Sequence, residues 1–234
     1  MSTINDVKGY FGEAFTFQNM LSAKNKRLWI DDNTFYITIA EIQPLRSDGF
    51  FLNMGVKFMW HIPDSIIYEF VEGETRIFPQ NPPLLEAALY DSPDFEKELA
   101  FMKQGALKKL QAYRELKNLD VLAIRLRERK DLFYYTNQNN CNDVDVSLAI
   151  VEMLRGNRAV AMKIFDNTRD NPLTQELAPF CQSEEDFREE LLRRIRDVKS
   201  QFSTNYRLSL TLPDSLPVQP QAQKRSFWSF FKAR

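Results

Sequence analysis

The chain contains a single histidine, His61, and this limits the chemistry that its side chains can perform. One imidazole excludes sites that need two histidines, which include most catalytic zinc centres. His61 follows an apolar run that ends in Trp60 and precedes Ile62, so we expect a partly buried structural residue and not a catalytic base. Glycine-rich phosphate loops, the GxSxG nucleophile motif and the HExxH zinc motif are absent from the sequence. We therefore predict no catalytic residues and no cofactor.

Two further residue types can hold a metal ion or react as nucleophiles. Asp31 and Asp32 are adjacent carboxylates, but with Asn33 they form a cluster that favours a turn, and we predict a turn and no metal site. Cys141 and Cys181 lack the CxxC spacing of a zinc knuckle or a redox pair. We expect both thiols to be free and buried in a reducing compartment.

Two groups of basic residues raise the question of nucleic-acid binding. Each group is interleaved with acids such as Glu128, Asp131, Glu190 and Asp197. Alternating charges along a helix favour a solvated face and not a track for phosphates, so we predict that nucleic acid is not the partner. The basic residues are Arg125, Arg127, Arg129, Lys130, Arg193, Arg194 and Arg196.

The sharpest functional signal lies in the last residues of the sequence, QKRSFWSFFKAR. No acid follows Asp214, so removing four of the 31 basic residues leaves the rest of the chain with 27 bases against 32 acids. On a helix, Phe227, Phe230 and Phe231 form one apolar stripe. A helix of this length is marginal in water, so we expect the segment to order on contact with another surface. The residues that we predict to bind are Lys224, Arg225, Phe227, Trp228, Phe230 and Phe231.

Three surfaces could receive this basic aromatic tail, residues 224–234. A groove in a partner protein is the favoured one, because aromatic side chains serve as anchors in such grooves. The spacing also resembles the sliding-clamp binding box, although Lys224 stands where that box has a glutamine. The alternatives are the acidic body of the same chain, which matches the tail in charge, and an anionic membrane surface.

The elements that carry these residues follow from hydrophobic periodicity. A helix is predicted over 4–21, a hairpin over 26–30 and 34–42, and a half-buried antiparallel strand over 50–60, with further strands at 65–71 and 75–79. A long helix begins at Ser92 as N-cap, and a shorter helix covers 119–128 before a loop at 136–143. Two helices over 144–168 turn at Gly156-Asn157, a helix capped by Ser183 covers 183–199, and a strand is suggested at 205–212.

These elements predict an α+β fold in which helices pack on an antiparallel sheet and the C-terminal half is helical. We predict an α+β domain over 1–135, a helical extension over 136–212, a proline-rich linker over 213–223 and the basic aromatic tail over 224–234. The sequence lacks a signal peptide pattern and any apolar run long enough to span a membrane, so we expect a soluble cytoplasmic protein.

The segment from Lys26 to Phe58 resembles the opening of a bacterial family of domains of unknown function, numbered 4304. Phe50, Asn53, Gly55 and Val56 match the F-x-x-N-x-G-V element of that family. The resemblance covers 26–168 and implies an α+β fold, bacterial origin and no established catalytic residues; some relatives look like immunity or defence proteins. With the tail, it favours a non-enzymatic binding or adaptor protein. An enzyme with a non-standard acid-base site is the competing interpretation.

Overall fold

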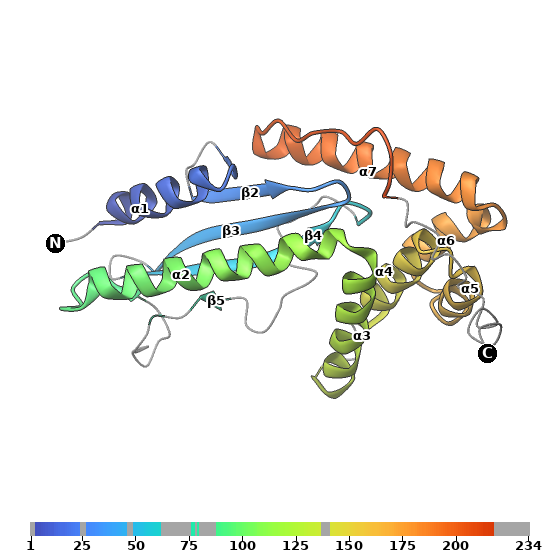
Figure 1. The fold of residues 1–234 in the computed structure, drawn as a ribbon, viewed down its shortest axis with the longest axis horizontal. Helices are drawn as coiled ribbons and strands as arrows, with labels where there is room; N and C mark the ends of the chain where they lie inside the picture. Colours follow the sequence, from blue (N-terminus) through green and yellow to red (C-terminus); the bar gives the residue numbers. More distant parts are fainter. Residues whose placement is uncertain are drawn as a thin grey trace, which may run out of the picture.

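The computed structural model describes residues 3–23, 27–45, 49–61, 76–77, 79, 88–136 and 141–217, without the side chains of 130–142. Within these residues the fold is α+β: helices pack on an antiparallel sheet, and the C-terminal half is helical (Figure 1). The predicted fold class is therefore confirmed. None of the described helices combines the length and apolar character needed to cross a membrane.

The sheet is a meander whose neighbouring strands are antiparallel. Its order is β1-β2-β3-β4-β5, and β6 pairs with β4 beside β5. The strands β2, β3 and β4 are rich in β-branched and aromatic residues, which suit a pleated surface. The strands are β1 (Leu21–Ser22), β2 (Leu28–Asp32), β3 (Tyr36–Leu45), β4 (Gly49–Phe58), β5 (Arg76–Ile77) and β6 (Ala88–Leu89).

The predicted hairpin is present as β2 and β3, but its turn lies later than expected. Asp31 and Asp32 pair with Thr38 and Ile37 as the last two residues of β2, and the turn occupies 33–35. The two aspartates are therefore strand residues, and the prediction of a turn at these positions is wrong. Short strands β1 and β6 were not predicted, and the strand suggested at 65–71 lies outside the described residues.

Strand β4 is buried on both faces, which corrects the expectation of a half-buried strand. Its even-numbered residues are apolar and buried as predicted, but Asn53 and Lys57 on the opposite face are also only 7% and 2% exposed. The first face packs under α1 (Ile4–Phe17) and α2 (Phe95–Arg114), where the ring of Phe50 lies 6.1 Å from that of Phe11. Period-2 alternation identified the strand correctly, but it could not reveal that a second layer covers the polar face.

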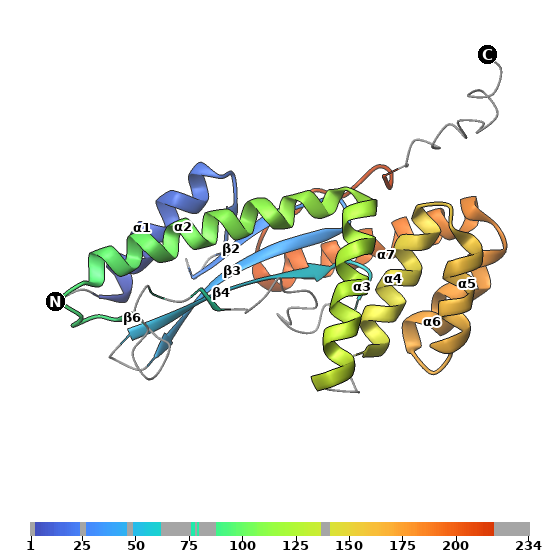
Figure 2. The ribbon, with the colours of Figure 1, turned by 60° about the horizontal axis from the view of Figure 1, so that its bottom comes forward.

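That second layer is α7 (Glu184–Tyr206), so the sheet lies between α2 and α7 (Figure 1). Side chains of opposite faces of β2 mark the two layers. Asp31 binds Arg114 at the end of α2, whereas Asp32 binds Lys199 of α7. The remaining helices lie together beyond one end of the sheet (Figure 2): α3 (Leu119–Thr136), α4 (Cys141–Leu154), α5 (Arg158–Asn167) and α6 (Pro172–Leu177).

The long helix α2 begins two residues later than its sequence signals suggested. Ser92 was predicted as the N-cap, but Asp94 holds that position and makes no side-chain cap hydrogen bond. The hydroxyl of Ser92 instead donates to Glu98 at 3.0 Å and accepts from the Asp94 amide. The predicted inner face is confirmed, since Leu99, Ala106 and other members of the pattern are buried.

The helical half follows its capping signals closely. The turn between α4 and α5 is at Gly156, whose φ of 78° is the left-handed conformation that glycine adopts without strain. Ser183 caps α7 by accepting from the Asp186 amide, as predicted. The helix predicted over 119–128 continues to Thr136. A loop was predicted over 136–143, but its described residues, Thr136 and 141–143, belong to α3 and α4.

The strand suggested at 205–212 is absent, because α7 and its contacts with the sheet occupy this segment. Helix α7 continues to Tyr206 and ends at Arg207, whose φ is 53°. The backbone of Thr211 then forms hydrogen bonds with side chains and not with a neighbouring strand. Its amide donates to Asp32 at 2.6 Å, and its carbonyl accepts from Lys199 at 2.9 Å.

Candidate functional site

His61 lies against Ser147, a residue that sequence analysis did not single out. Its Nε2 atom is 3.0 Å from Ser147 Oγ, and the indole of Trp60 donates to the same oxygen at 3.1 Å. Burial lowers the pKa of His61 to about 3, and the nearby charges of Lys57 and Arg194 act in the same direction. The imidazole is therefore neutral at ordinary pH and has no strong tendency to take up a proton.

A histidine beside a serine can activate the serine hydroxyl as a nucleophile. This pair instead has the features of a buried contact between two elements of the fold. Ser147 is only 2% exposed, and it is on α4 while His61 follows β4. A general base works best when its pKa is near the working pH, which this imidazole does not satisfy. The hydrogen bonds among His61, Ser147 and Trp60 connect the sheet to the helical half. No signal in the sequence marks Ser147, because 86 residues separate it from His61.

Asp31 and Asp32 point to opposite faces of β2 and meet different cations. Arg114 donates to both carboxylate oxygens of Asp31, at 3.0 and 2.7 Å. Lys199, which is 1% exposed, donates to Asp32 at 2.6 Å, and burial lowers the pKa of its ammonium while the hydrogen bond to Asp32 opposes that shift. Over the described ranges, no group of three or more His, Cys, Asp or Glu could hold a metal ion. The two carboxylates fasten α2 and α7 to the sheet.

Another buried carboxylate, Glu152, lies inside the helical half and was not predicted. It is fully buried and accepts from Arg127, from Arg155 at 2.8 Å and from the side chain of Asn157 at 2.6 Å. The only signal for it was an acid within an otherwise apolar helix pattern. Arg155 also donates to Asp120 at 2.5 Å, so these contacts tie α3 to α4.

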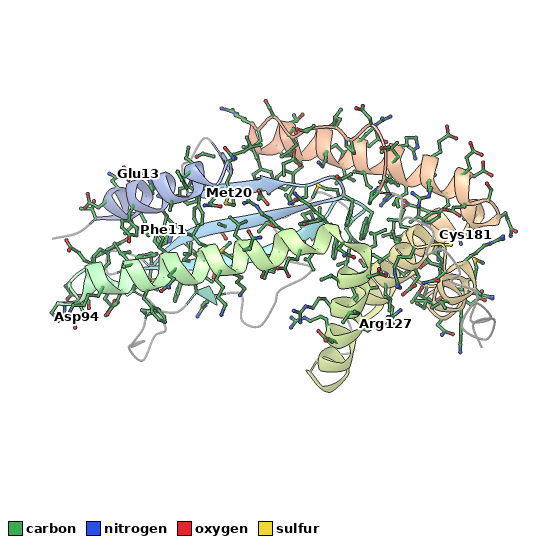
Figure 3. All side chains as sticks on the ribbon, in the orientation of Figure 1. Phe11, Glu13, Met20, Asp94, Arg127 and Cys181 are labelled. Carbon is green, nitrogen blue, oxygen red and sulfur yellow. The ribbon has the colours of Figure 1, made fainter. Side chains whose placement is uncertain are left out.

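Several of the basic residues considered for nucleic-acid binding are ion-paired. Arg125 pairs with Glu128. Arg127, which lies on α3 (Figure 3), pairs with Glu152. On α7, Arg193 pairs with Glu190 and Asp197, and Arg194 pairs with Glu176. Arg193 is exposed, as the predicted solvated face requires, whereas the side chain of Arg194 is only 15% exposed. Of the two predicted buried thiols, Cys181 is free and buried, whereas the side chain of Cys141 lies outside the described residues.

The predicted binding residues, from Lys224 to Phe231, lie outside the described residues, as does most of the linker. Its first part, 213–217, is described and is packed on α7, which differs from the extended tether that was expected. Arg196 donates to the carbonyl of Pro213 at 2.8 Å and Arg188 to that of Pro217 at 3.2 Å. Buried Leu216 holds the segment between these two contacts. The chain therefore runs back along α7 in the opposite direction to the helix.

A groove opens between α7 and this returning segment. Its volume is about 450 Å³, and Leu192 and Leu216 contribute apolar surface to it. Glu185, Glu189 and Asp214 also line it, and all three are exposed. A second hollow of about 670 Å³ shares Glu189, Leu192 and Asp214 with the first and extends along α7. Of all the surfaces considered above, this α7 groove is the one nearest along the chain to the predicted binding residues.

Comparisons with protein-family models, with curated proteins and with solved structures found no match to this chain. The resemblance to family 4304 therefore stays a prediction. The described side chains form two kinds of arrangement: buried polar contacts that hold the layers together, and an open groove beside the last described residues.

Proposed function

We propose that the protein is a non-enzymatic binding or adaptor protein, and that its basic aromatic tail docks on a partner protein. The residues that make this contact are Lys224, Arg225, Phe227, Trp228, Phe230 and Phe231. The partner presents an apolar groove with acidic residues at its edge, because this surface complements a stripe of phenylalanines flanked by cations.

One observation carries the proposal: the chain is clamped to the body immediately before the tail. Lys199, Arg196 and Arg188 donate in turn to the carbonyls of Thr211, Pro213 and Pro217 along one helix. Hydrogen bonds from charged donors are stronger than those between neutral groups. The chain therefore leaves a fixed place on the surface, and only six residues separate Pro217 from the start of the tail at Lys224.

The state of the body's ionisable groups supports binding over catalysis. Contacts between different helices and strands hold His61, the two aspartates of β2 and Glu152. Groups used in this way are costly to release for chemistry, because an unpaired buried charge is strongly unfavourable. The resemblance to family 4304, with its immunity or defence proteins, favours a binding role as well.

The test is affinity capture from the organism's own lysate with the full chain as bait. A variant that combines Phe227→Ala, Phe230→Ala and Phe231→Ala should lose a discrete partner that the unmodified chain retains. With the purified partner, each aromatic anchor should contribute about 2 kcal/mol, or roughly 30-fold in Kd. Phe17→Ala is the matched control, because Phe17 is an aromatic on α1 that is 84% exposed.

The same partner set for the bait, the triple variant and the Phe17→Ala control would contradict the proposal. Binding of the full chain to phosphatidylserine vesicles, lost in the triple variant and without any protein partner, would replace it with the membrane alternative. Turnover of nucleotide, nucleic acid or ester substrates by the purified chain would contradict the non-enzymatic part.

A further inference from the structure

The α7 groove has more negative charge than its own cations neutralise. Three carboxylates of α7 are paired within the helix: Glu184 with Arg188, and Glu190 and Asp197 with Arg193. In contrast, Glu185, Glu189 and Asp214 form no ion pair with any other residue that the structure describes. Three exposed acids thus surround an apolar surface formed by Leu192 and Leu216.

The apolar floor and acidic edge of the groove are complementary to a ligand that has both apolar side chains and cations. Burying apolar side chains on Leu192 and Leu216 contributes about 25 cal/mol per Å² of apolar surface. Cations at the edge would reduce the repulsion among the three carboxylates, an effect that salt weakens. Phe180, which is 37% exposed, lines the adjoining hollow and lengthens the apolar surface.

We infer that the occupant is residues 224–234 of the same chain, which dock in the α7 groove as an internal ligand. The segment carries four cations and four aromatic residues and contains no acid. Leu216 lines the groove itself, and the six residues 218–223 separate Pro217 from Lys224. Fully extended, they span about 20 Å, which is enough for the tail to turn back onto the surface that it has just left.

Attachment to the same chain makes weak contacts sufficient. A short flexible linker gives its two ends an effective concentration on the order of millimolar. A tail whose intrinsic Kd for the groove is about 0.1 mM would therefore be docked roughly nine-tenths of the time. The groove does not need the affinity of a stable interface between separate molecules.

Docking in the groove regulates the tail. The cations and aromatics that bind the groove are the same residues proposed to bind the partner, so the two surfaces compete. A partner's apparent affinity falls in proportion to the fraction of tail that is free, which is about tenfold for the occupancy above. This regulatory consequence rests on the proposed function, whereas docking within the chain does not.

Tryptophan fluorescence of the full chain provides the test. Of its three tryptophans, Trp29 and Trp60 are only 1% and 0% exposed, so the difference between the full chain and a Trp228→Phe variant isolates the emission of Trp228. At low salt, Trp228 should be protected from acrylamide and its emission blue-shifted. Salt at about 1 M, where the Debye length is about 3 Å, should increase its quenching at least about twofold.

Charge reversal in the groove should have the same effect without added salt. The variant combines Glu185→Lys and Glu189→Lys, both at exposed positions, so folding is retained and is checked by the thermal unfolding temperature. The matched control reverses two exposed acids on other helices, Glu13 and Glu96. Glu13 lies on α1, at the opposite end of the long axis from Cys181, which precedes α7 (Figure 3). The control should leave Trp228 protected.

Equal quenching of Trp228 in the unmodified chain, the groove variant and the control would overturn the inference. Protection that disappears on dilution would overturn it too, because the tail would then occupy a second copy of the chain. The affinity capture described above tests the proposed function independently of the groove. If capture persists while Trp228 is unprotected, only the groove is wrong; if Trp228 is protected and no partner is captured, only the proposed function is wrong.

Discussion

The neutral imidazole of His61 makes a specific contribution to the pH dependence of stability. Its pKa is about 3 in the folded protein, against about 6.5 in an unfolded chain. Between these values the unfolded state binds a proton that the folded state does not, so acidification favours unfolding. The free energy of unfolding should therefore fall by about 1 kcal/mol from about pH 7.5 to about pH 5.5, as measured by urea denaturation.

His61→Gln should remove this slope, because the chain has no other histidine and carboxylates titrate at lower pH. Ser147→Ala is the matched control. It removes the hydrogen-bond partner of Nε2, while burial, the main cause of the lowered pKa, remains. An unchanged slope in His61→Gln would show that the imidazole is not held neutral.

At this scale the sequence predicted the kind of residue but not its partners. The position of His61 after an apolar strand indicated burial, and the mixed charges around Arg193 indicated a solvated helix face. The partners of Asp32 and His61 could not be predicted, since Lys199 is 167 residues away and Ser147 is 86 residues away. Contacts of this kind depend on how the layers stack, which local patterns do not encode.

At the scale of elements, two glycines should respond to the same substitution with opposite signs. A Cβ atom at Gly9 or at Gly156 would meet no atom within 4 Å. Gly9 lies inside α1, where alanine should raise the free energy of unfolding by about 0.5–1 kcal/mol. Gly156 has a φ of 78°, so alanine there should lower it by about 1–2 kcal/mol.

Urea unfolding of Gly9→Ala and Gly156→Ala measures both effects, and each variant is the control for the other. Because neither site is crowded, packing cannot account for a difference between them. Shifts of the same sign would contradict the turn between α4 and α5 or the continuity of α1.

Capping and periodicity predicted helices better than strands. Ser183 and Gly156 marked their helix ends correctly because cap and turn chemistry is local. The strand suggested at 205–212 failed because its backbone is bonded by Asp32 and Lys199, and β4 proved buried on both faces because α7 covers it. Both errors have one origin, since the role of α7 as a second layer is a property of the whole fold.

At the scale of the molecule, α7 connects the layers and directs the chain toward the tail. It begins near the helical half and runs along the sheet to Lys199, and residues 211–217 return along its surface (Figure 1). The α7 groove and the clamp that precedes the tail therefore belong to the same helix. This arrangement is the basis for treating the tail as a docking segment with a resting place on the body.

Photo-cross-linking from the tail tests the central claim, that the aromatic stripe docks on a partner, most directly. Phe227 is replaced by p-benzoylphenylalanine in the organism's own cells, and Phe17, which is 84% exposed, is replaced in the control. Irradiation should yield a discrete adduct with one other protein from position 227, together with an internal cross-link to the α7 groove, and neither product from position 17. The same adducts from both positions, or none from position 227, would contradict it.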